Sequence, residues 1–111
     1  MIYWPQKAGN SMFGLSEKAL SGISEVFRKY SAIEEAKIFG SRALDTHRPN
    51  SDVDIALLGQ LNLGLVDRIK ADLDEIATPY QFDVVAYNLI GHSKLKEHID
   101  RFGKLFYRRD A

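Results

Sequence analysis

Two aspartates are the residues of this sequence whose type and spacing are best suited to chemistry. Asp52 and Asp54 are two apart in a stretch where they alternate with Val53 and Ile55, so both carboxylates project from one face of a predicted strand. Like charges held so close resist ionisation, and a divalent cation between them would relieve the repulsion. Hard oxygen ligands suit magnesium or manganese. A bare Asp-x-Asp is, by itself, more often just the solvated edge of a strand.

Neighbouring residues favour the cation site. Gly40 and Ser41 end a short predicted strand over residues 36–39, where backbone amides and a serine hydroxyl can hold an anion and glycine allows close approach. Asp83 lies in a later predicted strand and comes beside the first two acids if the strands pair. We call the anion-binding turn at Gly40 and Ser41 the phosphate cradle. Three carboxylates that face this cradle fit two-metal phosphoryl or nucleotidyl transfer.

Other ligand-binding motifs are incomplete or absent in this sequence. Asn50, Asp52 and Asp54 match the first three ligand positions of an EF-hand loop, but Ile55 stands where that loop needs glycine and Leu61 where it needs glutamate. Neither of the glycine-rich nucleotide loops, Gly-x-x-x-x-Gly-Lys-Ser/Thr or Gly-x-Gly-x-x-Gly, is present. The histidines lack zinc-type spacing and are expected to be surface or capping residues: His47, His92 and His98.

Periodicity gives the order of the elements that must position these residues: helix, strand, loop, strand, helix, strand, helix. Ser16 is the expected N-cap of the first helix, Thr78-Pro79 the end of the second, and Ser93 the N-cap of the third, whose inner stripe extends to Phe106. The predicted strands cover residues 36–39, 52–57 and 82–87.

The connections predict how the strands pair. The loop between the first two is too short to assume a crossover helix, so we expect them to be antiparallel, whereas the strand–helix–strand unit over residues 53–87 predicts a parallel crossover. The fold class is therefore α/β (α+β), with a small mixed three-stranded sheet backed by helices. We expect an N-terminal arm at residues 1–14 and a single domain over residues 15–111.

The composition excludes several kinds of protein and site. The 111 residues contain no cysteine, which excludes disulfide scaffolds, zinc ribbons, iron–sulfur sites and thiol nucleophiles and suits a cytoplasmic location. No apolar run approaches a membrane span. Residues 45–91 carry eight acidic and three basic side chains, so we predict no direct nucleic-acid binding. The final stretch carries basic residues that either form a solvated helix face or dock an acidic partner: Lys94, Lys96, Arg101, Lys104, Arg108 and Arg109.

The run from Gly40 to Leu57 resembles the signature of the polymerase-β-like nucleotidyltransferase superfamily. That signature is Gly-Ser, ten residues and then Asp-x-Asp, and residues 42–51 are the ten. The closest group is the minimal nucleotidyltransferases, the MNT or MntA-like proteins of bacteria and archaea. The similarity begins at about residue 16 and includes Asp83 and the closing segment 99–107, whereas Leu44-Asp45 departs from the basic residue and glycine of many relatives.

The resemblance implies the superfamily fold with about four helices, and magnesium-dependent transfer of AMP from ATP. Asp52 and Asp54 would bind both of two Mg²⁺ ions, and Asp83 would complete the metal site on the acceptor side and help deprotonate the attacking hydroxyl. The β and γ phosphates would be held by three consecutive residues: Gly40, Ser41 and Arg42.

The same resemblance implies a partner. Members of this size resemble the antitoxin of HEPN/MNT toxin–antitoxin pairs, in which the MNT protein transfers AMP to a tyrosine of the HEPN toxin. Two alternatives stay open: a catalytically silent module that neutralises its partner by binding, and a standalone transferase for a small molecule. The chain length disfavours the second, because one small core leaves little room for an acceptor pocket. The sequence allows a homo- or hetero-oligomer.

Overall fold

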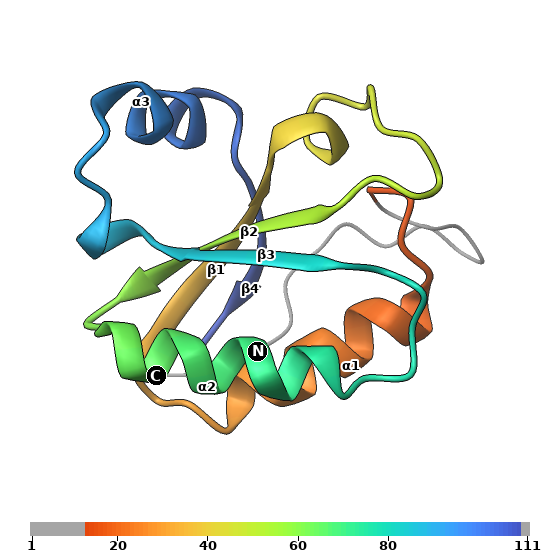
Figure 1. Cartoon of the computed structure of the whole chain (residues 1–111), viewed down its shortest axis with the longest axis horizontal. Coiled ribbons are helices and arrows are strands. Elements are labelled where there is room, and N and C mark those ends of the chain that lie inside the picture. Colours follow the sequence, from red (N-terminus) through yellow and green to blue (C-terminus); the bar gives the residue numbers. More distant parts are fainter. Residues whose placement is uncertain (1–12, 110–111) are drawn as a thin grey trace.

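The computed structural model describes residues 13–109, so the first twelve residues of the predicted N-terminal arm lie outside the described part. Within it, three α-helices and two short 3₁₀ helices surround a four-stranded sheet (Figure 1). The elements in chain order are α1 (Glu17–Arg28), β1 (Ile33–Phe39), η1 (Gly40–Arg42), β2 (Val53–Gly59), α2 (Leu63–Asp74), β3 (Phe82–Ala86), η2 (Tyr87–Leu89), α3 (Ser93–Phe102) and β4 (Lys104–Arg108).

The sheet is mixed, with the strand order β3-β2-β1-β4. β1 is antiparallel to both β2 and β4, and β2 is parallel to β3. Both predicted pairings are therefore confirmed, and so is the α/β class. The parallel pair places the N-terminal ends of β2 and β3 side by side, which is where the acidic residues lie.

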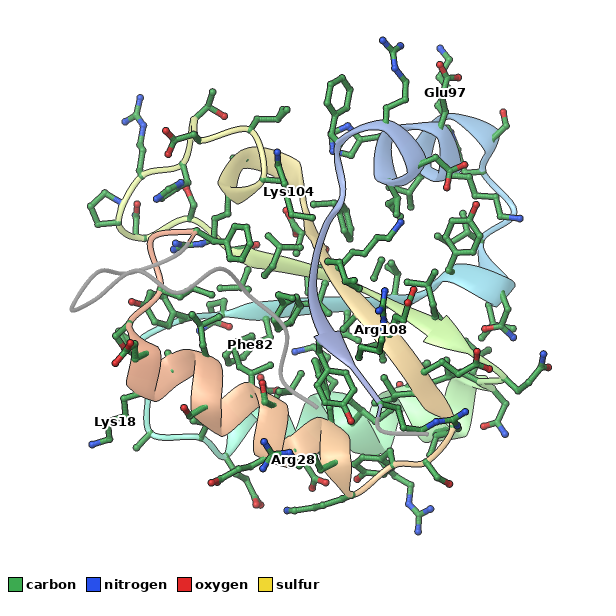
Figure 2. All side chains as sticks on the ribbon, turned by 180° about the vertical axis from the view of Figure 1, so that it is seen from behind. Lys18, Arg28, Phe82, Glu97, Lys104 and Arg108 are labelled. Carbon is green, nitrogen blue, oxygen red and sulfur yellow. The ribbon has the colours of Figure 1, made fainter. Side chains whose placement is uncertain are left out.

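The two faces of the sheet are covered differently. α1 and α2 pack on one face, whereas α3 and η1 lie on the other (Figure 1). The alternate residues of β2 and β3 that point toward α1 and α2 are buried, as Figure 2 shows for Phe82. The intervening residues point to the face of α3, where Phe39, Ala56 and Ile99 form a second, smaller apolar cluster. This smaller cluster leaves part of that face open for a site.

Local sequence signals locate the start of α1 correctly but misplace two other helix ends. The Ser16 hydroxyl accepts a hydrogen bond from the Ala19 amide at 3.1 Å, so the predicted cap of α1 is confirmed. α2 ends at Asp74, earlier than the expected Thr78-Pro79, and α3 has His92 rather than Ser93 as its N-cap. None of the helices between residues 13 and 109 has the length and apolar character of a membrane span.

The expectation of three strands and about four helices is wrong in its counts. α3 ends before Gly103, and the chain then forms β4 along the free edge of β1. A register shift in this pairing leaves both Phe106 and Tyr107 buried, which breaks the alternation typical of a strand. Phe106 also falls at helical spacing from Ile99, so the sequence pattern wrongly extends the helix.

Candidate active site

The sheet brings two of the three predicted carboxylates into register. Asp54 on β2 is paired with Asp83 on β3, and both lie on the face opposite α1 and α2. Asp52 immediately precedes β2, two residues before Asp54. The Asp52 and Asp83 side chains are exposed, whereas Asp54 is half-buried. The three acids therefore belong to one small region at the N-terminal ends of the parallel strands.

The electrostatics of Asp54 show that the three carboxylates act on one another. The pKa of Asp54 is raised from 3.8 to about 6, first by burial and in addition by the negative charges of Asp83 and Asp52. Arg42 opposes the shift, because its positive charge favours the carboxylate form of Asp54. A half-buried acid between two other acids is costly to ionise without a cation.

The donor chemistry of this region fits a hard divalent cation. Carboxylate oxygens are the ligands that Mg²⁺ prefers, and their shared negative field is what such an ion would neutralise. As they stand, no three Asp, Glu, His or Cys side chains in residues 13–109 are gathered tightly enough to hold an ion. Asp54 and Asp83 are paired across the two strands, and Asp52 lies just before β2.

Gly40 allows the end of β1 to approach Asp54. Phe39 is paired with Asp54 in the antiparallel ladder, and the chain then turns at Gly40 with φ of +72°. A Cβ at residue 40 would lie 2.3 Å from Asp54 Oδ2, which is much closer than real Cβ contacts. Glycine is therefore required both by the backbone conformation and by the carboxylate beside it.

The turn after β1 leaves the donors of Ser41 available. Among the described residues, neither the Ser41 amide nor its hydroxyl has a hydrogen-bond partner, while its carbonyl accepts from the Thr46 amide at 2.9 Å. The Gly40 amide, in contrast, already donates to His98 Nε2 at 3.1 Å. Of this Gly-Ser pair, Ser41 thus offers the free donors and Gly40 offers the close approach.

Arg42 is placed differently from the other predicted phosphate contacts. Its side chain is almost completely buried, with 2% exposure, and it donates to the carbonyls of Phe13 at 2.8 Å and Ser51 at 2.9 Å. The guanidinium also lies 5.1 Å from the centre of the Tyr80 ring. Desolvation lowers its pKa, but the Asp54 and Tyr80 charges counteract that effect. Arg42 therefore holds the loop before β2 together and does not offer its donors to the cradle.

His98 is a residue of the site that the sequence analysis missed. It lies on α3, half-buried, with Phe39 and Phe102 on its flanks at ring-centre distances of 6.0 and 5.3 Å. The expectation of a surface or capping histidine fits His92, the exposed N-cap of α3, but not His98. Its spacing of three from Leu95 and four from Phe102 places it on the apolar stripe of the helix, a signal that was available.

The outer side of α3 forms a shallow, mixed-charge hollow next to His98. It has a volume of about 300 Å³ and is lined by Lys94, Glu97, His98, Arg101 and Phe102. Figure 2 shows Glu97 pointing away from the sheet, and its carboxylate is 3.8 Å from the Arg101 guanidinium. The basic residues of this helix are therefore solvated and partly paired, at the margin of the site.

Comparison with known proteins gives a family match and several similar folds. Residues 21–111 match the family described as "Polymerase beta, Nucleotidyltransferase". The fold is similar to that of a chain in a toxin–antitoxin crystal structure with AMP-PNP, at a TM-score of 0.68 and 22% identity, covering 82% of this chain and 74% of that one. A chain from the tri-AMPylated HEPN toxin in complex with MNT antitoxin, from Shewanella oneidensis, gives a TM-score of 0.62 at 19% identity, covering 81% and 70%. No curated protein matches the sequence at a significant level.

Proposed function

Because this chain belongs to the polymerase β nucleotidyltransferase family, we propose that it transfers AMP from ATP to a hydroxyl group of a partner protein. The observation that carries the proposal is the position of Asp54, which pairs with Asp83 on one side and closely approaches Gly40 on the other. This arrangement sets acidic ligands next to a turn with free phosphate donors. It suits a triphosphate that binds together with a divalent cation.

Each side chain then has a distinct part in the proposed reaction. Asp52, Asp54 and Asp83 would hold two Mg²⁺ ions, which when bound neutralise phosphate charge and align the reacting groups. The Ser41 amide and hydroxyl would donate to the β and γ phosphates. Asp83 is exposed at the edge of the sheet, where it would accept the proton of the acceptor hydroxyl. The acceptor oxygen bonds to the α phosphorus and pyrophosphate leaves.

The proposed acceptor is a tyrosine of a HEPN-type toxin, and the chain would act as its antitoxin in the cytoplasm. The fold neighbours support this choice, because one combines a tri-AMPylated HEPN toxin with MNT antitoxin. The exposure of Asp83 supports it as well, since a protein hydroxyl can reach an acid at an open sheet edge without a deep pocket. The order β3-β2-β1-β4 makes β3 that edge.

A transfer assay tests the proposal. The protein is incubated with a candidate HEPN partner, Mg²⁺ and ATP labelled at the α phosphate. We expect the partner to become labelled, and to stay unlabelled when EDTA is present from the start of the reaction. ATP labelled at the γ phosphate is the control and should leave the partner unlabelled, because pyrophosphate departs. Label from the γ position would indicate a kinase instead, and no label from either position would contradict the proposed transfer.

A further inference from the structure

We propose that His98 is a positioning residue of the phosphate cradle: it holds the Gly40 amide and so fixes the direction of the Ser41 donors. The inference rests on the function proposed above. It assigns to α3, a helix outside the Gly-Ser and Asp-x-Asp motif, a direct part in shaping the nucleotide site. The contact that carries it is the hydrogen bond from the Gly40 amide to His98 Nε2, at 3.1 Å.

This hydrogen bond specifies the state of the imidazole. Nε2 accepts a hydrogen bond from the Gly40 amide, so it carries no proton of its own, and the ring is neutral with its proton on Nδ1. An amide N–H has one proton to donate, which means that Gly40 does not offer it to a phosphate while the contact holds. The cradle therefore depends on Ser41, whose direction follows from how Gly40 is held.

The ring of His98 is itself held in place by its surroundings. The Phe39 ring meets it at an interplanar angle of 74° and the Phe102 ring at 48°. The next residue, Ile99, is fully buried in the small cluster with Phe39 and Ala56, which anchors α3 on the sheet. The acceptor is thus presented by a packed side chain rather than a mobile one.

Gly40 needs such an anchor because of its conformation. Glycine at φ of +72° has no side chain to restrict it, and the turn it makes has a wide range of alternatives. The Asp54 carboxylate lies against Gly40 on one side, and His98 Nε2 accepts a hydrogen bond from the Gly40 amide on another. The Gly40 carbonyl accepts hydrogen bonds from the amides of Ala43 and Leu44, so the backbone that leads into Ser41 is held on both sides of Gly40.

Two substitutions separate the acceptor from the ring. His98→Phe keeps an aromatic ring between Phe39 and Phe102 but removes the acceptor, whereas His98→Gln offers an amide oxygen at similar reach and removes the ring. We expect His98→Phe to weaken AMP-PNP binding and raise the KM for ATP about tenfold, the effect of losing one hydrogen bond that orders the site. The kcat at saturating ATP should change by less than about twofold. His98→Gln should restore the KM while lowering the melting temperature.

A purely structural role would give the opposite pattern, with KM unchanged in both variants and only the melting temperature affected. His92→Phe is the matched control, since His92 is an exposed residue at the start of the same helix. In uniformly ¹⁵N-labelled protein, the N–H···N bond should give a scalar coupling between the Gly40 amide nitrogen and His98 Nε2.

The outcomes distinguish the two proposals. Wild-type protein that binds no AMP-PNP and transfers no nucleotide overturns the proposed function, and this inference with it. Wild-type protein that is active, together with unchanged nucleotide affinity in His98→Phe, overturns this inference alone. Absence of the scalar coupling in the wild type also overturns it, whatever the activity.

Discussion

The carboxylate of Asp54 fills the space that a side chain on Gly40 would need. Asp54 lies on β2, and Gly40 directly follows the antiparallel strand β1, with Phe39 and Asp54 as the last partners of the β1–β2 ladder. A Cβ on residue 40 would stand 2.3 Å from Asp54 Oδ2. The glycine of the Gly-Ser pair and the second aspartate of Asp-x-Asp are therefore one structural unit, although the sequence separates them by a long loop.

The first prediction is that Gly40→Ala disrupts this unit. If the new residue keeps φ of +72°, at a cost of roughly 1–2 kcal/mol, it must also displace the Asp54 carboxylate; otherwise the turn itself must change. We expect a loss of about 1–3 kcal/mol in the free energy of unfolding and loss of nucleotide transfer. Denaturant unfolding and the transfer assay measure these two effects. Gly91→Ala is the control, because a Cβ there meets no atom within 4 Å, and equal effects of both changes would contradict the argument.

The second prediction concerns the acids of the proposed metal site. Asp52→Asn combined with Asp54→Asn should abolish Mg²⁺-dependent transfer and leave the fold intact, because both amides keep the shape but not the charge. The free energy of unfolding should stay equal or rise, since the repulsion with Asp83 is relieved. Activity and thermal melting are compared with Asp67→Asn, an exposed acid on α2. Transfer at the wild-type rate by the double variant would show that the catalytic assignment is wrong.

The third prediction is a pH dependence of stability that comes from Asp54. Its pKa is about 6 in the folded chain against an ordinary value of 3.8, so the folded state binds more protons between those two pH values. The free energy of unfolding should therefore fall as pH rises from about 4 to 6, and the cost is complete above pH 6. Partial exposure of the group and screening reduce that cost to about 1–2 kcal/mol.

Asp54→Asn is the variant that exposes this dependence. It should be more stable than the wild type at pH 7, and the difference should vanish near pH 4, where the wild-type carboxyl is protonated. Unfolding in denaturant at a series of pH values measures the difference. A constant difference from pH 4 to pH 8 would show that Asp54 does not titrate in this range.

Much of the fold follows from local sequence signals. Ser16 caps α1 as predicted because its hydroxyl and the Ala19 amide are three residues apart, and the strand pairings follow from loop length. β4 was missed because its contacts are not local. Its bulge buries Phe106 and Tyr107 together, and only the partner strand β1 reveals that register.

The site shows the same division between local and long-range information. The Gly40–Ser41 turn, Asp52 and Asp54 could be identified from the sequence, because the Gly-Ser pair and the Asp-x-Asp pair stand at a fixed spacing within one short stretch. His98 becomes part of the site only when α3 packs over β1, and Arg42 becomes buried only when Phe13 and Ser51 close around it. Sequence spacing identifies the chemistry of residues on adjacent elements, but not the supports that tertiary packing brings to them.

The fourth prediction separates the role of Asp83 from that of the other two acids. Asp83→Asn should lower kcat by more than it weakens nucleotide binding, because the proposed role of this exposed residue is on the acceptor side. Single-turnover transfer and AMP-PNP binding measure the two quantities separately. Equal losses in both would instead make Asp83 a ligand of the nucleotide-bound metal only.

The last prediction decides whether the chain neutralises its partner by catalysis or by binding to it and covering its surface. If the chain neutralises its partner by AMP transfer, a small amount of it with ATP and Mg²⁺ should silence many partner molecules, and each should gain the mass of one or more AMP units. If it acts by covering, inhibition should be stoichiometric, independent of ATP and unchanged in the Asp52/Asp54 double variant. The basic residues at the margin of the site, such as Lys94 and Arg101, would then tune the encounter rate alone, and raised salt would slow it.

Titration of the partner, followed by intact mass spectrometry with and without ATP, separates the two modes. Stoichiometric inhibition without a mass increase would overturn the enzymatic mode, because a catalyst turns over and leaves its product modified.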